Sequence, residues 1–181
     1  MAHYILAICF DSGDTIIDEA TEIKDETETT LQAELIPGAD KVLYELKRQG
    51  YKLALIADGP VGTFRNTLTQ HGLYDLFDVY SISEEIGVDK PASRMFINAL
   101  EQLSIQQEDY DRVVMVGNHL ARDIKGANQL GIISVWLDWA PRRSKVPTDE
   151  SEVPQYTIKT PLELLSVIES LENRGKNKPI H

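Results

Sequence analysis

The sequence has a single cysteine, no long apolar run and few basic residues. Because Cys9 is the only cysteine in 181 residues, no disulfide framework can form within the chain, and a reducing compartment suits it. No apolar stretch approaches the roughly 20 residues that a membrane-spanning helix needs. The apolar segment 5–10 is too short for the core of an export signal and ends on Asp11. We therefore expect a cytoplasmic protein with no membrane segment.

Acidic residues outnumber basic ones, with 29 Asp and Glu against 18 Lys and Arg and a formal net charge of −11. Binding to a nucleic-acid backbone depends on concentrated Lys and Arg, so we expect no nucleic-acid surface. A single phosphate group needs less, because a metal ion, one lysine or a few backbone amides can hold it. The length and the hydrophobic fraction of 42% fit one globular domain that spans residues 1–181.

Strand-like and helix-like runs alternate along the chain, which is typical of βαβ units and a parallel sheet. Apolar runs predict strands at residues 5–10, 51–57, 79–82, 112–116, 132–137 and 156–158. Helical spacing of apolar residues predicts helices at 38–49, 61–70, 92–103 and 120–130, and a last helix that begins at a capping box of Thr160, Pro161 and Glu163. We predict a three-layer, Rossmann-like α/β fold with a mostly parallel sheet of five to six strands.

Three segments interrupt this alternation. Between residues 18 and 36, seven acidic residues stand against one basic residue, Lys24, with little apolar periodicity. Such a segment cannot bury a core of its own, so we expect a solvated acidic flap or insertion and no full cap domain. Residues 138–155 are rich in Pro, Arg and Ser and predict a surface loop, and residues 173–181 predict a frayed basic tail.

Polar motifs follow four of the predicted strands, at the edge of a parallel sheet where ligands bind. In chain order they read Asp11-Ser-Gly-Asp-Thr15, Asp58-Gly59, Lys90-Pro91 and Gly117-Asn-His-Leu-Ala-Arg-Asp123. Each motif alone is a weak signal, since Asp after a strand often caps a turn. All four in this order and at these spacings resemble the haloacid dehalogenase-like hydrolase superfamily.

The resemblance implies a phosphatase-type reaction with a Mg²⁺ cofactor. Asp11 would attack phosphorus and form an aspartyl phosphate, which splits one difficult step into two. Lys90 would screen the charge on Asp11 and on the phosphoryl oxygens. Backbone amides at Asp58 and Gly59 would hold the phosphate. The implied metal ligands are Asp11, the backbone carbonyl of Gly13, Asn118 and Asp123.

Three positions depart from the family pattern. The proton-transfer residue expected two positions after Asp11 is Gly13, and Asp14 takes over only if the loop turns differently. The hydroxyl expected at the end of the second strand is replaced by Ala57, which removes a hydrogen bond worth about 1.5 to 3 kcal/mol. Asn118 stands where the family has Asp, so one negative charge is lost and metal binding should weaken.

These departures leave competing functions open. The leading interpretation is a Mg²⁺-dependent phosphatase acting on a small or macromolecular phosphomonoester. The alternative is a weakened pseudoenzyme that binds a phosphate or a partner, as Gly13 and Ala57 suggest. Dehalogenase chemistry, in which Asp attacks carbon without a metal, has no use for the oxygen ligands Asn118 and Asp123.

The surroundings of the site are also expected to be simple. With only the acidic flap as a cover, the site should be open, which favours a large substrate, a partner protein or a homo-oligomer that supplies a lid. His119 is more simply explained as an ordinary loop histidine than as a substrate contact. Arg142 and Arg143 are more simply explained as a solvated pair than as phosphate ligands.

Overall fold

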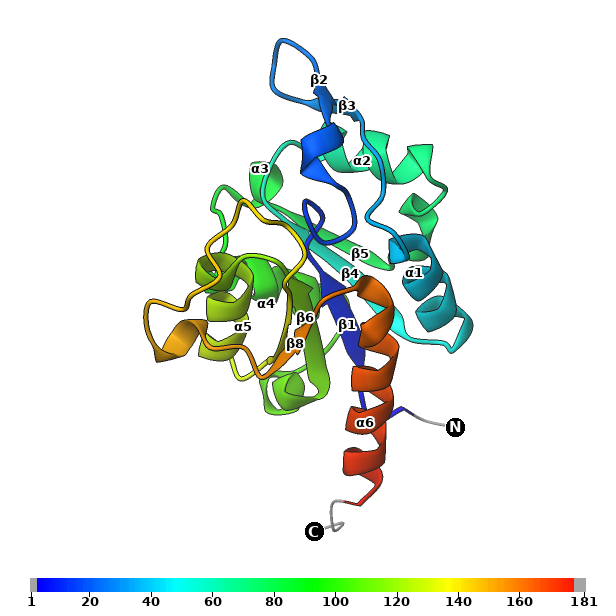
Figure 1. The fold of residues 1–181 in the computed structure, drawn as a ribbon. Coiled ribbons are helices and arrows are strands. Elements are labelled where there is room, and N and C mark those ends of the chain that lie inside the picture. Colours follow the sequence, from blue (N-terminus) through cyan, green and yellow to red (C-terminus); the bar gives the residue numbers. More distant parts are fainter. Residues whose placement is uncertain (1–2, 178–181) are drawn as a thin grey trace.

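The central feature of the fold is a six-stranded parallel sheet. A computed structural model describes residues 3–177. The strands are β1 (Ala7–Phe10), β4 (Lys52–Ala57), β5 (Val79–Ile82), β6 (Val113–Gly117), β7 (Ile133–Leu137) and β8 (Tyr156–Ile158). Their order is β5-β4-β1-β6-β7-β8, and every neighbouring pair is parallel (Figure 1). This confirms the predicted fold class, and the strand ends agree with the predicted ranges to within two residues.

Both faces of the sheet are buried, which explains why its strands are continuously apolar. Side chains alternate along β1, so Ile8 and Phe10 enter one core cluster while Cys9 enters the other. Burial raises the pKa of the Cys9 thiol to about 12, so the only cysteine is an inert core residue.

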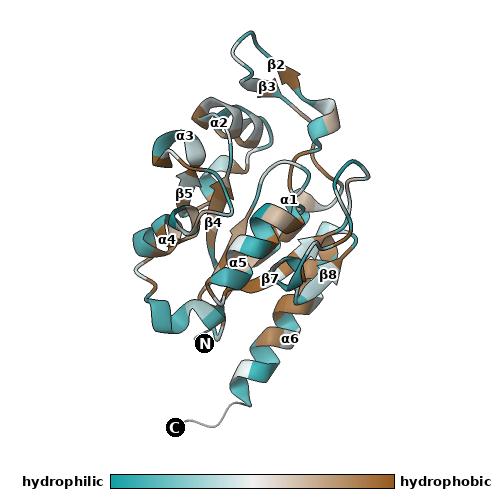
Figure 2. Ribbon diagram, turned by 90° about the vertical axis from the view of Figure 1, so that its left-hand side faces the viewer, coloured by the Kyte–Doolittle hydropathy of each residue, from teal (hydrophilic) through white to brown (hydrophobic). Residues whose placement is uncertain are grey.

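Helices cover the two faces of the sheet as separate layers. One face is covered by α1 (Ala39–Arg48), α2 (Val61–Gln70) and α6 (Leu164–Lys176). The other is covered by α4 (Ser93–Gln102) and α5 (Lys125–Gln129). Hydropathy colouring shows brown strands between these layers and teal outward helix faces (Figure 2). The three-layer arrangement follows from the amphipathic spacing of the helices.

The last helix differs in part from its prediction. The 3-10 turn η6 (Pro161–Glu163) carries the capping box of Thr160 and Glu163 and leads into α6, as expected. However, α6 continues to Lys176, so residues 173–176 are helical where a frayed tail was predicted. Residues 178–181 of that predicted tail lie outside the described residues. Among helices within 3–177, none is both long and apolar enough to cross a membrane.

The acidic segment 18–36 folds into a small flap. It contains the 3-10 turn η1 (Glu19–Thr21) and a hairpin of β2 (Ile23–Lys24) and β3 (Thr30–Gln32), which projects beyond the carboxyl edge of the sheet (Figure 1). Polar contacts fix it to α2, because the amide of Thr30 donates to Thr63 Oγ1 at 2.9 Å and Asn66 Nδ2 donates to the Thr30 carbonyl at 3.0 Å.

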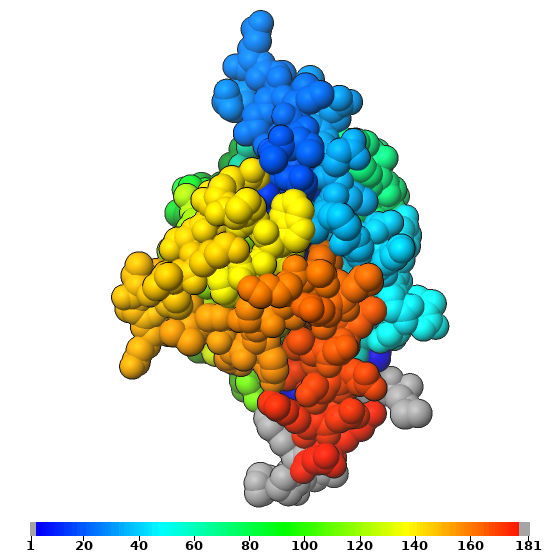
Figure 3. Space-filling model, in the orientation of Figure 1, coloured from blue at the N-terminus to red at the C-terminus, as the bar shows by residue number. Residues whose placement is uncertain are grey.

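The remaining short helical elements lie in the connections between strands. They are η2 (Tyr74–Leu76), α3 (Ser83–Ile86), η3 (Gln107–Arg112), the π-helical turn η4 (Leu120–Ile124) and η5 (Glu150–Glu152). The predicted helix at 120–130 is therefore divided into η4 and α5. The loop at 138–155 lies against the base of the flap in the space-filling view (Figure 3). This contact places a wall of the pocket described below.

Candidate active site

The strand order brings the predicted motifs together at the carboxyl edge of the sheet. Asp11 follows the central strand β1, and its neighbours β4 and β6 lead into Asp58 and Asn118. A cavity of about 340 Å³ opens at this edge. Seven of the nine predicted site residues line it, namely Asp11, Gly13, Asp58, Gly59, Lys90, Asn118 and Asp123. Ala57 and Asp14 do not, and the flap contributes further walls that the sequence did not predict.

Lys90 contacts the aspartates of two motifs, Asp11 and Asp123. Its Nζ lies 2.7 Å from Asp11 Oδ1, 2.7 Å from Asp123 Oδ1 and 2.7 Å from the carbonyl oxygen of Ile56. Burial alone would lower the pKa of Lys90, but Asp11, Asp123 and Asp58 raise it above its ordinary value. The ammonium is therefore retained, and it is fixed beside the predicted nucleophile.

The two carboxylates outnumber this single cation. Burial, together with Asp123, raises the pKa of Asp11 to about 6, although Lys90 acts in the opposite direction. Asp11 Oδ1 is bound to Lys90, whereas Oδ2 accepts a long hydrogen bond of 3.4 Å from Thr15 Oγ1, and the backbone of Ser12 also hydrogen-bonds to the carboxylate. The site thus holds an excess of negative charge, which favours binding of a cation. The weakly hydrogen-bonded Oδ2 of Asp11 is suited to attack an electrophile.

The donor set is compatible with a hard divalent cation. Asn118 is 4% exposed, and its Nδ2 has no hydrogen-bond partner among the described residues. Asp123 Oδ1 approaches Lys90 as an ion pair without the alignment of a hydrogen bond. Because an amide group can rotate to present its oxygen, Asn118 can offer Oδ1 beside the two carboxylates. Within residues 3–177 no group of three or more His, Cys, Asp or Glu is placed to hold a metal ion. Mg²⁺ usually keeps several water ligands and needs only one or two carboxylates.

Asp123 is positioned by the turn that follows β6. Its Oδ2 accepts a hydrogen bond from the amide of His119 at 3.0 Å, at the start of η4. A Cβ atom on Gly117 would lie 2.3 Å from Asp123 Oδ2. Glycine is therefore required at the end of β6 so that the carboxylate can pack against the strand.

The second motif serves mainly to orient its loop. Asp58 Oδ1 accepts from the amide of Lys90 at 2.9 Å, and Oδ2 accepts from Arg122 Nη1 at 3.1 Å. The amide of Gly59, expected to bind phosphate, donates instead to Ser83 Oγ at 2.9 Å. Ala57 is buried beneath this loop and does not reach the cavity.

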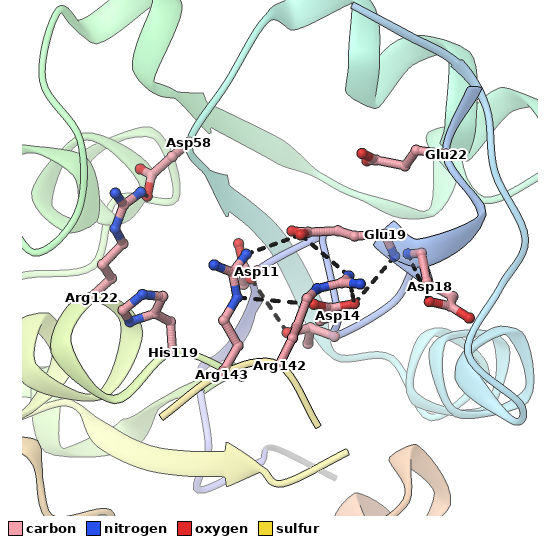
Figure 4. Close-up of polar contacts among 12 residues, drawn as sticks. Asp11, Asp14, Asp18, Glu19, Glu22, Asp58, His119, Arg122, Arg142 and Arg143 are labelled. Atoms are coloured by element: carbon pink, nitrogen blue, oxygen red, sulfur yellow. Dashed lines mark hydrogen bonds and ion pairs between the residues drawn. The ribbon is translucent and has the colours of Figure 1, made fainter. Parts of the chain in front are cut away.

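Asp14 is not brought to the site. Its φ of 53° is left-handed, a conformation that Asp tolerates, and its carboxylate is fully buried. Oδ1 accepts from Arg142 Nη2 at 2.6 Å and from the amide of Glu19 at 3.2 Å (Figure 4). Gly13 does not adopt a left-handed conformation, so the loop does not make the alternative turn that would bring Asp14 to the cavity. The geometry does not support proton transfer by Asp14.

The arginines of the 138–155 loop are partly exposed, and they also form ion pairs that the sequence did not predict. Arg143 Nη2 lies 2.9 Å from Glu19 Oε2, and Arg142 Nη2 lies 3.4 Å from the same oxygen (Figure 4). Glu19 lines the cavity, and burial and Asp14 raise its pKa, with Arg143 opposing. Sequence reasoning missed Glu19 because it lay among seven acids of the flap with no motif to distinguish it.

His119 also lines the cavity and is half-buried. Burial lowers the pKa of His119, and the nearby Arg143 and Arg122 lower it further. The imidazole is therefore mainly neutral near pH 7. The cavity therefore also contains a histidine, whose role in the site the sequence had suggested only weakly.

Asp11 thus follows the central strand of a parallel sheet, beside a buried lysine and side-chain oxygens that could ligate a cation. A sequence model of the haloacid dehalogenase-like hydrolase family matches residues 4–131, so the chain belongs to this family. Curated relatives of this chain include phosphatases and a nucleotidase.

Curated relatives are about one third identical to this chain over the aligned region. Glyceraldehyde 3-phosphate phosphatase of Methanopyrus kandleri is 33% identical over 135 residues, which cover 75% of this chain and 57% of that protein. Pyrimidine 5'-nucleotidase YjjG of Escherichia coli is 35% identical over 129 residues, covering 71% and 54%. The chain thus spans less than two thirds of the length of these relatives.

Solved structures support the fold. A HAD phosphatase from Thermococcus onnurineus superposes with a TM-score of 0.73 at 20% identity, covering 90% of this chain and 97% of that one. The HAD-hydrolase YfnB from Bacillus subtilis, solved bound to magnesium, superposes with a TM-score of 0.71 at 19% identity, covering 91% and 99%.

Proposed function

We propose that this chain is a Mg²⁺-dependent phosphatase that hydrolyses a small phosphomonoester through an aspartyl phosphate at Asp11. The observation that carries the proposal is the arrangement of Asp11, Lys90 and Asp123, in which one oxygen of Asp11 is fixed and the other is weakly engaged. The phosphatase names of the relatives support the same reaction class.

The chemistry follows from these contacts. Asp11 Oδ2 bonds to phosphorus while the bond from phosphorus to the ester oxygen breaks. Water then attacks the aspartyl phosphate, which releases inorganic phosphate and restores Asp11. Lys90 stabilises the negative charge throughout. Asp11, the carbonyl of Gly13, Asn118 and Asp123 would hold Mg²⁺, which when bound reduces the repulsion between carboxylate and phosphate.

The cavity favours a small anionic substrate over a macromolecule. Its volume of about 340 Å³ is that of a small-ligand pocket, and the flap and the 138–155 loop form its walls. Lys24, Arg122 and Arg143 also line it, each paired with a carboxylate, and these cations can contact an anion once a metal ion offsets the acidic lining. Phosphorylated trioses and phosphoserine, on which relatives act according to their names, are of this size.

The test is phosphate release from a panel of phosphomonoesters with and without Mg²⁺. We expect Mg²⁺-dependent release, and we expect Asp11→Asn to reduce it by at least about 10³-fold because the nucleophile is lost. Asp75→Asn is the matched control, since it makes the same change at an exposed position outside the cavity. Activity retained in Asp11→Asn would show that the catalyst lies elsewhere.

The pseudoenzyme alternative has its own supporting observations, which are the buried Ala57 and the engaged amide of Gly59. It predicts that beryllium fluoride, a mimic of the aspartyl phosphate, binds in the presence of Mg²⁺ while no ester of the panel is hydrolysed. Calorimetric titration of wild type and Asp11→Asn with beryllium fluoride tests binding at Asp11, and the ester panel then separates the two functions.

A further inference from the structure

We propose that Glu19 is the proton-transfer residue of this site and that its Oε1 protonates the leaving alcohol and then deprotonates the attacking water. The proposal rests on the proposed function of Asp11 and adds a catalytic residue to it. Glu19 lies in the flap, at the start of η1, and lines the same cavity as Asp11.

The first observation is the fit between Glu19 and Gly13. A Cβ atom on Gly13 would lie 2.0 Å from Glu19 Oε1 and 2.7 Å from Glu19 Cδ. The carboxyl group of Glu19 therefore occupies the space that a side chain at residue 13 would take. The backbone of Gly13 is not left-handed, so its conformation does not require glycine. The space for Glu19 does require it.

The second observation is how the two carboxylate oxygens are used. Oε2 is held by Arg143 at 2.9 Å and by Arg142 at 3.4 Å. No hydrogen bond or ion pair within residues 3–177 engages Oε1, the oxygen directed at Gly13. Asp14 accepts from the amide of Glu19, so it serves as a positioning residue for the backbone. One oxygen is thus anchored, and the other faces the loop that carries the nucleophile (Figure 4).

Other titratable groups of the cavity are less suited to the role. Lys90 and Asp123 are paired with each other, and both oxygens of Asp58 already accept hydrogen bonds. Glu22 and Glu28 lie 3.3 Å and 3.9 Å from Lys24 in the hairpin, away from the nucleophile loop. His119 is the remaining competitor, and the experiment below includes it.

The proton balance of the reaction is complete with Glu19. When Asp11 Oδ2 bonds to phosphorus, the ester oxygen leaves with the proton of Glu19. When a water oxygen bonds to phosphorus and the bond to Asp11 breaks, the water proton returns to Glu19. The products are the alcohol and inorganic phosphate, and both side chains recover their starting states.

The first experiment compares esters with good and poor leaving groups in Glu19→Gln, which keeps size and the arginine contacts. With the alkyl phosphate that the wild type turns over fastest, we expect kcat to fall about 10²- to 10⁴-fold. With p-nitrophenyl phosphate, whose leaving group needs no proton, we expect a burst of about one equivalent of nitrophenolate and an accumulated phosphoenzyme visible by intact mass. A purely structural role for Glu19 would produce no such difference between esters.

The second experiment is a double-mutant cycle with Gly13→Asp. Glu19→Ala should lose the alkyl phosphatase activity, and adding Gly13→Asp should restore it to within about tenfold of wild type, because a carboxylate then returns to the vacated space. Glu34→Gln is the matched control, since it neutralises an exposed carboxylate of the same flap outside the cavity and should leave kcat unchanged. Thermal melting verifies that each variant is folded.

The outcomes separate this proposal from the one on which it rests. If the wild type hydrolyses no ester, the proposed function fails and the role of Glu19 fails with it. If the wild type is active while folded Glu19→Gln keeps its kcat on alkyl esters, only the role of Glu19 is wrong. A leaving-group-dependent loss in His119→Asn but not in Glu19→Gln would overturn the assignment in favour of His119.

Discussion

Buried carboxylates lie at opposite edges of the sheet and differ in how completely they are hydrogen-bonded. At the amino edge, Glu172 of α6 accepts hydrogen bonds from the amides of Tyr4 and Ile5 at 2.8 and 3.0 Å and from Tyr51 Oη at 3.0 Å. His3 Nδ1 lies 3.5 Å from the same carboxylate. Burial alone would raise the pKa of Glu172, but these hydrogen bonds outweigh it and lower the pKa.

At the carboxyl edge of the sheet, the buried carboxylates are less completely hydrogen-bonded. There burial and Asp123 raise the pKa of Asp11 to about 6, and the amide of Asn118 has no partner within the described part of the chain. A buried carboxylate with its hydrogen bonds satisfied holds elements together, whereas buried carboxylates with excess charge are typical of a site that binds a ligand. The comparison distinguishes a structural carboxylate, Glu172, from the candidate active site, although both contain buried acidic side chains.

The largest expected effect comes from removing a carboxylate at the carboxyl edge. Asp123→Ala should abolish the rise in melting temperature that millimolar Mg²⁺ causes in the wild type, because a ligand that binds only the folded state stabilises it by mass action. Phosphate release should fall by at least about 10²-fold. Differential scanning fluorimetry with and without Mg²⁺ checks the first effect. A wild type that shows no Mg²⁺ shift would contradict the metal site.

A smaller effect, on stability alone, is expected at the amino edge. Glu172→Ala leaves the amides of Tyr4 and Ile5 and the hydroxyl of Tyr51 without their acceptor, which should lower the free energy of unfolding by about 3 to 5 kcal/mol. Urea denaturation measures this, with Glu169→Ala as control on the exposed side of α6. At a temperature where the variant is folded, its kcat should equal that of the wild type. A loss of kcat in folded Glu172→Ala would contradict the purely structural role of Glu172.

The sequence predicted those parts of the molecule that depend on local pattern. Buried strands such as β1 and β6 are continuous apolar runs, and parallel pairing then brings Asp11, Lys90 and Asp123 to one edge whatever the details of the loops. The hairpin of the flap was missed because polar contacts between Thr30 and Thr63 fix it, and these leave no periodicity in the sequence.

Predictions of catalytic roles failed where the role of a residue depends on contacts with residues distant in the sequence. Asp14 was considered for proton transfer on the condition that its loop turned differently, but its backbone is left-handed and its carboxylate contacts Arg142. Glu19 could be recognised only once the loop geometry showed that its carboxyl group occupies the space beside Gly13. A glycine where a family motif has an acid is therefore a signal to search for an acid from another segment.

The third prediction concerns stability at the carboxyl edge without metal. Because the folded pKa of Asp11 is raised to about 6, ionising it favours the unfolded state, and stability is lost as pH rises through about 6. In EDTA, Asp11→Asn should therefore be more stable than the wild type by about 1 to 3 kcal/mol at pH 8, with the gain shrinking below pH 5. Urea denaturation at the two pH values measures it. If Asp11→Asn were less stable than the wild type at pH 8, the charge of Lys90 would compensate the buried carboxylates fully.

The smallest expected effect is the pH dependence of the stability that Glu172 contributes. Its sign is opposite to that expected for Asp11. The folded pKa of Glu172 is lowered, so the ionised carboxylate contributes stability that is present above its ordinary pKa of about 4.3 and is lost as pH falls through the folded pKa. The stability difference between wild type and Glu172→Gln should therefore be constant from about pH 6 to 8 and shrink toward pH 3. Because burial offsets part of the hydrogen bonding, this change should be smaller than that of Asp11→Asn. If both variants responded to pH with the same sign, the two edges would not differ in the way that their contacts indicate.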